Sequence, residues 1–187
     1  MFKNVKFLFY IQILIFIISC TQQQEKQKNQ IETNKLPKVI NMKLTSLAFG
    51  NNGAIPSEFT CDGADISPSL TISEVPNNAK SLALIMDDPD APVETFVHWV
   101  VWNIPPNSKE IKRGAEPDGM QGKTDFRKLG YGGPCPPSGT HRYFFKLYAL
   151  DTTLNLPQGS TKKDLERAMQ GHIIEKTQLI GMYRRKH

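Results

Sequence analysis

The pattern of apolar and polar positions from about residue 39 onward predicts a β-rich domain. His141–Leu150 is the clearest strand, because its alternate positions divide between two faces. Ser81–Met86 and Phe96–Asn103 are short apolar runs that stop at proline-containing turns, as strands do. Weaker strand predictions fall on Met42–Leu47 and Ser69–Ser73.

The pattern predicts one clear helix, Lys162–Gln170. Ser160 or Thr161 can cap its start, and Gly171 can supply the left-handed residue that ends it. Many short strands with few helices favour a sandwich or barrel over a parallel α/β sheet. The expected fold class is therefore mainly β.

The N-terminal residues 1–19 have the pattern of an export signal. Lys3 and Lys6 precede the apolar run Phe7–Ile18, which is shorter than the roughly 20 residues that a membrane span needs. The run closes at Ser19-Cys20, which resembles a bacterial lipobox, in which the cysteine becomes the lipidated first residue. An ordinary secretory signal or an uncleaved anchor is the alternative interpretation.

Residues 20–38 are polar and of low complexity, with Ile31 and Leu36 as their only aliphatic side chains. Such a segment cannot bury enough apolar surface to fold, so we interpret it as a tether. The predicted division is a signal peptide at 1–19, a lipidated tether at 20–38 and a domain at 39–187. The predicted location is the cell envelope, with the chain lipid-anchored at the outer membrane or at another periplasmic or extracytoplasmic face.

Composition agrees with one folded domain. The chain has 187 residues, of which 39% are hydrophobic, and this excludes wholesale disorder. Its formal net charge of +5 would fall to +3 without Lys3 and Lys6, which is too small a surplus to indicate a nucleic-acid partner. Cys61 and Cys135 would permit one disulfide in an exported protein, or they could remain free thiols.

The connection between Pro105 and Gly139 is long and contains seven glycines and six prolines. A loop of that length is usually functional or disordered. Its segment Gly130–Pro137 combines stiff and permissive residues, which suits a wall of backbone held close to a ligand.

Three polar clusters lie at the ends of the predicted strands. They are the Asp-Pro-Asp segment Asp87–Pro92, the single His98, and His141 with Tyr143 on one strand face. Imidazoles and a phenol are good hydrogen-bond donors to an anion, and a neighbouring aspartate can orient an imidazole. Each cluster also has a purely structural interpretation, as a turn, a buried histidine or an ordinary strand.

Several of these segments match one known family. The matching pieces are Phe59–Gly63, Ile66–Pro68, Asp87–Pro92, Val97–Trp99, Gly130–Pro137 and His141–Ala149. From about residue 42 to its end, the chain resembles the phosphatidylethanolamine-binding protein family, in its bacterial Raf-kinase-inhibitor-like branch.

The resemblance implies a two-sheet antiparallel β-sandwich with small peripheral helices and a pocket for phosphate-like anions, including a phospholipid head group. The residues that it assigns to the pocket are Asp88, Asp90, His98, Gly133, Pro134, His141 and Tyr143. One departure concerns the pocket rim, because the segment between Pro137 and His141 is short. Arg127 and Lys128 also stand where relatives often carry a small residue, and the sequence assigns them no role.

The leading functional hypothesis is a membrane-tethered module that binds a small anionic or phosphorylated ligand and modulates a partner protein, without catalysis, metal or cofactor. The first alternative is a hydrolase that uses the Asp/His cluster with a metal or as acid and base. No His-Glu-x-x-His or Gly-x-Ser-x-Gly motif supports that alternative. A protease or kinase inhibitor is the second alternative and rests on fold-level analogy.

Overall fold

The computed structural model describes residues 41–185, so the predicted signal peptide, the lipidation at Cys20 and the tether lie outside the described residues. Within 41–185 the chain is mainly β, as predicted. The elements are β1 (Lys43–Thr45), β2 (Gly53–Ala54), the 3-10 helix η1 (Ser57–Phe59), β3 (Leu70–Ser73), β4 (Ser81–Asp88), β5 (Phe96–Ile104), β6 (Glu110–Ile111), β7 (Met120–Gln121), β8 (His141–Leu150), α2 (Lys162–Ala168) and β9 (Ile173–Tyr183).

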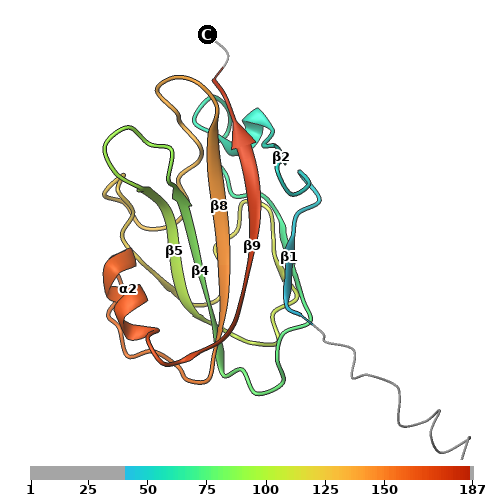
Figure 1. Ribbon diagram of the computed structural model, residues 1–187, viewed down its shortest axis with the longest axis vertical. Coiled ribbons are helices and arrows are strands. Elements are labelled where there is room, and N and C mark those ends of the chain that lie inside the picture. Colours follow the sequence, from blue (N-terminus) through green and yellow to red (C-terminus); the bar gives the residue numbers. More distant parts are fainter. Residues whose placement is uncertain (1–40, 186–187) are drawn as a thin grey trace, which may run out of the picture. The chain divides into compact units, whose positions relative to one another are not determined.

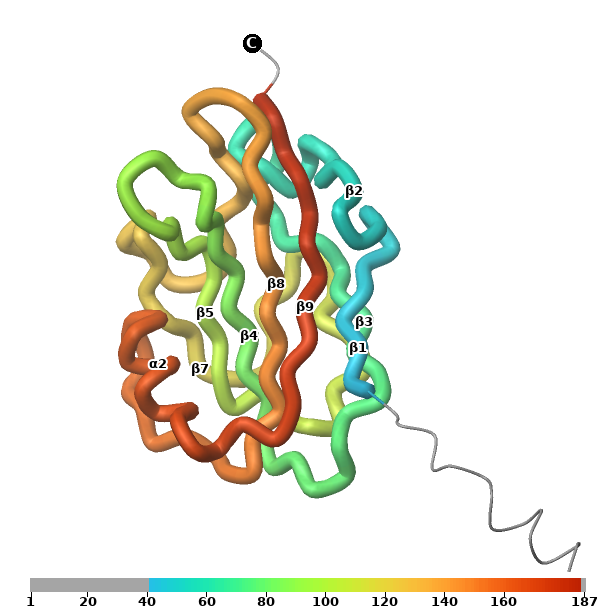
Figure 2. Tube along the Cα trace, viewed as in Figure 1, coloured from blue at the N-terminus to red at the C-terminus, as the bar shows by residue number. Residues whose placement is uncertain are grey.

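The strands form two sheets. The larger has six strands in the order β2-β9-β8-β4-β5-β7, and the smaller has the order β1-β3-β6. Figure 1 shows β5, β4, β8 and β9 side by side, and Figure 2 shows β1 and β3 next to each other. Neighbouring strands are antiparallel except for β2 and β9, which pair in parallel through Gly53 and Ala54.

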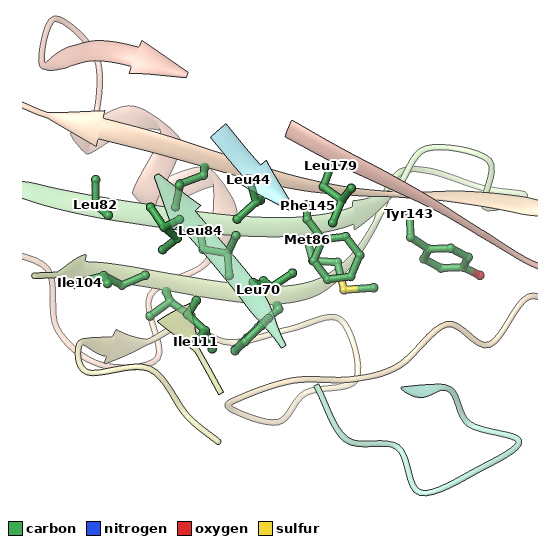
Figure 3. Close-up of a cluster of buried hydrophobic side chains, with 14 of the residues drawn as sticks. Leu44, Leu70, Leu82, Leu84, Met86, Ile104, Ile111, Tyr143, Phe145 and Leu179 are labelled. Atoms are coloured by element: carbon green, nitrogen blue, oxygen red, sulfur yellow. The ribbon is translucent and has the colours of Figure 1, made fainter. Parts of the chain in front are cut away.

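The main core fills the space between the two sheets. Alternate residues of β4 and β8 face inward, and Figure 3 shows Leu84 and Phe145 with Leu70 of the smaller sheet. Tyr143 lies at one end of this group. The alternation that predicted β8 therefore describes a strand with one face in the core, where Tyr143, Phe145 and their inward neighbours are fully buried.

A second apolar cluster covers the outer face of the six-stranded sheet. Ala83 and Ile85 of β4 and Val100 of β5 lie there, packed with Leu165 of α2. Burial on both faces explains why β4 reads as a continuous apolar run without alternation. In the described residues, no helix is long and apolar enough to cross a membrane.

The predicted helix is confirmed, with a shorter end. The hydroxyl of Thr161 accepts a hydrogen bond from the Asp164 backbone N–H. The Asp164 carboxylate in turn accepts one from the Thr161 backbone N–H. Regular helix stops at Ala168, and Gly171 has the left-handed φ of 79° expected of a terminating glycine. The chain then continues into β9, a strand that the sequence pattern did not predict.

Candidate functional site

A buried ion pair joins the end of β4 to the start of β8. Asp88 Oδ2 and His141 Nδ1 are 2.7 Å apart, and both side chains are almost completely buried. Asp88 Oδ1 accepts a hydrogen bond of 2.8 Å from the Asp90 backbone N–H, which fixes the turn that leaves the strand. Both oxygens of this carboxylate are therefore engaged, and His141 Nδ1 carries the hydrogen that it donates.

His98 reaches the same region because β5 contains a β-bulge. Met86 pairs with Trp99 while the next residue, Asp87, pairs with Val97, so His98 is an extra residue in the ladder. A bulge of this kind changes the direction of a side chain without interrupting the sheet. His98 Nδ1 lies 2.8 Å from the Gly132 carbonyl oxygen and donates to it, because a carbonyl can only accept.

The remaining nitrogen of His98 is unusual. The side chain is buried, and Nε2 has no hydrogen-bond partner among residues 41–185. Burial lowers the pKa of His98, and this effect outweighs the opposing influences of the Gly132 carbonyl and the Asp88 charge. The imidazole is therefore neutral near pH 7, and its Nε2 is a buried hydrogen-bond acceptor.

Tyr143 supplies a second buried polar atom beside His98. The two rings meet edge to face with their centroids 5.2 Å apart, and Tyr143 Oη has no partner of normal hydrogen-bond geometry in the described structure. Burial, followed by the charge of Asp88, raises the pKa of Tyr143. The phenol therefore stays protonated and can donate a hydrogen bond.

An aromatic wall that the sequence did not predict surrounds His98. The Phe96 and Phe126 ring centroids lie 5.2 Å and 5.3 Å from the His98 ring, and 4.8 Å from each other. Phe96 could have been found from period two, because it precedes His98 by two residues on a strand. Phe126 lies in a turn and had no such signal.

The glycine-rich segment packs directly on the chain near η1. The Gly133 backbone N–H donates to Asp65 Oδ1 at 2.6 Å, and the Pro134 carbonyl accepts from the Cys61 N–H at 3.1 Å. A Cβ at Gly133 would come within 2.6 Å of the Phe59 carbonyl oxygen, so only glycine fits there.

A disulfide between Cys61 and Cys135 fastens the same two segments, with Cα atoms 5.4 Å apart. Cys61 is exposed and Cys135 is half-buried. Gly133 and Pro134 thus hold the wall in place, while the contact to His98 comes from their neighbour Gly132.

Asp90 does not join the buried group. Both of its oxygens bind the Arg142 guanidinium, at 2.6 Å and 2.9 Å, and Arg142 projects from the opposite face of β8 to His141. The hydrogen bonds to Arg142 lower the pKa of Asp90 to about 2. The structure therefore brings together Asp88, His98, His141 and Tyr143, and it places Asp90 beside them in a surface ion pair.

A metal centre needs several ligating side chains that converge on one point. Between residues 41 and 185, no three His, Cys, Asp or Glu side chains converge closely enough to hold a metal ion. The group Asp88, His98, His141 and Tyr143, named here the inner polar site, thus offers donors and acceptors to a ligand through its own side chains.

Comparison with known proteins places this arrangement in a family. The family model for phosphatidylethanolamine-binding protein matches residues 45–184, which is most of the chain. The chain belongs to the phosphatidylethanolamine-binding protein family. The match includes every residue of the inner polar site.

The relatives are widely distributed. A UPF0098 protein of Methanothermobacter thermautotrophicus is 55% identical over 150 residues, which cover 77% of this chain and 99% of the relative. A UPF0098 protein of Pyrococcus horikoshii is 50% identical over 157 residues, covering 79% of this chain and 78% of the relative.

Two solved structures share the fold. The crystal structure of a protein from Chlamydia trachomatis, described as a phosphatidylethanolamine-binding protein homolog, matches with a TM-score of 0.77 and 42% identity, covering 79% of this chain and 99% of that one. E. coli YbcL, described as a member of the mammalian family, matches with a TM-score of 0.73 and 31% identity, covering 78% and 99%.

Proposed function

We propose that the domain binds a small anionic or phosphorylated molecule at the inner polar site. The observation that carries this proposal is a pair of buried polar atoms, His98 Nε2 and Tyr143 Oη, on rings 5.2 Å apart, neither of which has a hydrogen bond of normal geometry within residues 41–185. A buried polar atom left unpaired costs roughly 1–3 kcal/mol. A ligand that pairs with both atoms removes that cost.

The hydrogen-bonding character of the site selects the ligand. Tyr143 donates, and His141 presents its Nε2 beyond the bond to Asp88, whereas neutral His98 accepts. A ligand therefore needs acceptor oxygens together with one proton to give. A phosphate monoester that retains one proton meets this need. If the ligand is instead a dianion, it brings no proton, and His98 would take one up from solvent on binding.

Binding without turnover is part of the proposal. Neither His98 nor His141 forms a hydrogen bond to a serine, threonine or cysteine of the described residues, so neither is paired with a nucleophile there. The name of the family supports a ligand that resembles a phospholipid head group. We also propose that a lipid on Cys20 holds the domain at a membrane of the cell envelope, where ligand binding modulates a partner protein.

The test is a titration of the full chain with phosphate and with phosphoethanolamine, followed by isothermal calorimetry. Tyr143→Phe removes one hydroxyl and keeps the ring, and we expect it to weaken binding about tenfold. The matched control is Tyr148→Phe on the same strand, whose residue faces the outer side of the sheet. It should leave the affinity unchanged.

Acidity provides a second test. Affinity for phosphate should rise as the pH falls from 8 toward 6, because the ligand or His98 then carries the shared proton. The proposal fails if neither ligand binds at concentrations of about 10 mM, or if Tyr143→Phe and Tyr148→Phe have equal effects.

A further inference from the structure

A second hollow adjoins the aromatic wall around His98, because Phe96 also lines it. Its volume is about 900 Å³, which is the size of a small-molecule site. It is formed by the connection 91–95 with the start of β5, by residues 123–127, and by Thr161 with the first residues of α2. Among the described residues that line it, none is Asp88, His98, His141 or Tyr143.

The lining of this hollow, named here the outer cavity, carries three cations that form no direct ion pair with the described residues. Lys123, Arg127 and Lys163 form no salt bridge and no side-chain hydrogen bond with the described residues. Lys162 differs, because its ammonium is bound by Asp87 at 2.5 Å. Lys163 is close enough to Asp164 to help lower the pKa of that carboxyl, although the two do not form an ion pair.

The acids of the outer cavity, Glu94, Asp125 and Glu166, form no direct ion pair with Lys123, Arg127 or Lys163 among the described residues. Asp125 Oδ2 accepts a hydrogen bond of 2.7 Å from the Val97 backbone N–H, and Glu166 lies 3.7 Å from Lys162. Glu94 is the remaining acid in the lining and has no ion pair among the described residues. The lining therefore holds four cations and three carboxylates, a formal net charge of +1, and three of its cations form no ion pair with the described residues.

The backbone of Arg127 adds an independent observation. Its φ is +62°, and its N–H donates to the Thr124 carbonyl while the Thr124 N–H donates to the Lys128 carbonyl. This is a tight hairpin turn whose left-handed position normally takes glycine or asparagine. An arginine there adopts a strained conformation that glycine would avoid, and such strain concentrates at functional sites.

Backbone hydrogen bonds fix the segment that carries Lys123 and Arg127. The Lys123 backbone N–H donates to the Ser160 carbonyl at 3.0 Å, and Lys123 also bridges to Thr161 and Leu129. The turn that carries Arg127 is thereby attached to the start of α2. The backbone that carries these charged groups therefore loses little conformational freedom when a ligand binds.

An apolar stretch completes the lining. Ala91, Pro92 and Val93 belong to the 91–95 connection, and the Val93 side chain is 95% exposed. We propose that the outer cavity binds a small polyanion, with its phosphate or carboxylate groups held by Lys123, Arg127 and Lys163 and its uncharged part against Pro92 and Val93. The guanidinium offers a two-pronged contact to either group, and the lysines act as point charges.

The test is a calorimetric titration of the full chain with inorganic pyrophosphate and, in parallel, with citrate, at low ionic strength. Arg127→Gly suits the left-handed backbone and removes one cation, so it keeps the fold while weakening binding about tenfold. Lys163→Ala should weaken it about fivefold. The control, Lys112→Ala, removes an exposed cation outside the cavity and should change the affinity less than about twofold.

The two arms distinguish the chemistry of the ligand. Tighter binding of pyrophosphate supports the outer cavity as a phosphate site, and tighter binding of citrate supports it as a carboxylate site, provided that Arg127→Gly weakens the binding in each case. The inference is overturned if Arg127→Gly and Lys163→Ala bind both probes like the unmodified chain, or if neither probe binds at about 10 mM.

The Tyr143→Phe chain separates this inference from the proposed function. We expect it to keep its pyrophosphate affinity, because Tyr143 does not line the outer cavity. If Tyr143→Phe abolishes pyrophosphate binding while Arg127→Gly does not, the polyanion occupies the inner polar site. The outer-cavity inference then fails while the proposed function stands.

Discussion

Asp87 and Asp88 are consecutive residues at the end of β4, and both are buried, yet they face opposite sides of the six-stranded sheet. On the outer side, Asp87 Oδ2 binds Lys146 at 2.8 Å and Lys162 at 2.5 Å. On the inner side, Asp88 binds His141 and the backbone of its own turn.

The two carboxylates differ in the kind of partner that balances them. Lysines keep their charge across the physiological pH range, whereas an imidazole gains or loses a proton within it. The Asp87 cluster is therefore suited to fastening Lys162 of α2 and Lys146 of β8 to the sheet. The Asp88 pair instead fixes an imidazole, whose second nitrogen can take part in a hydrogen bond to a ligand, and this suits a binding site.

The largest expected effect is a loss of stability when Asp87, on the outer side of the sheet, loses both of its lysine partners. Lys146→Met with Lys162→Met leaves Asp87 buried without a counter-ion, and we expect the free energy of unfolding in urea to fall by about 4 kcal/mol. Adding Asp87→Leu should restore most of that loss, because an apolar cluster then replaces the charges. A double variant as stable as the unmodified chain would contradict a fastening role for Asp87.

The inner side is also stabilised by a covalent bond, the disulfide between Cys61 and Cys135. Cys61→Ser with Cys135→Ser should lower the free energy of unfolding by about 3 kcal/mol, because the disulfide closes a loop with a sequence separation of 74. Thermal melts with and without a reductant would measure this loss. The reductant should destabilise the unmodified chain and leave the double-serine variant unchanged, and equal behaviour of the two chains would contradict the prediction.

Single substitutions at the two aspartates sharpen the comparison directly. Asp88→Asn should weaken phosphate binding about tenfold, because His141 loses its anionic partner. Asp87→Asn should leave phosphate affinity within about twofold of the unmodified chain, since its side chain faces the other side of the sheet. Calorimetric titration of both variants measures the difference, and equal losses would show that the sheet does not separate the two carboxylates functionally.

The smallest effect concerns acid stability. The lowered pKa of His98 means that acid protonates it in the unfolded chain first. The free energy of unfolding should therefore fall as the pH drops below about 6.5, by at most about 1.4 kcal/mol for each pH unit until the folded pKa is reached. In His98→Phe the fall over the same range should be smaller, as urea titrations at several pH values would show. An identical pH dependence in both chains would contradict a buried neutral His98.

The fold was predictable from sequence where alternation or length is strong. The predicted strand His141–Leu150 has the same bounds as β8, with one buried face, and the cap residues and Gly171 identify α2 to within two residues at its end. The strand β9 was missed because its residues are mostly half-exposed and carry Glu175, Lys176 and Gln178. Its position is decided by pairing along the full length of β8, which a local pattern cannot show.

The site was predictable in its residue types and less so in its contacts. Period two placed His141 and Tyr143 on one face and Arg142 on the other, as observed. The pairing of Asp90 with Arg142 depends on how a turn folds back on a strand, and the position of His98 depends on a bulge. Neither feature has a local sequence signal, since each is set by the register between strands.

The parallel pairing of β2 with β9 also has a consequence for the timing of folding. Gly53 and Ala54 lie near the start of the domain, and their partners Gly181 and Met182 lie near its end. β9 also lies between β2 and β8 in the sheet, so β2 cannot join the sheet before β9 is in place. Contacts between distant parts of a chain slow folding, because a large loop must close first. We therefore expect β2 to join the six-stranded sheet late in folding, after β9 has paired with β8.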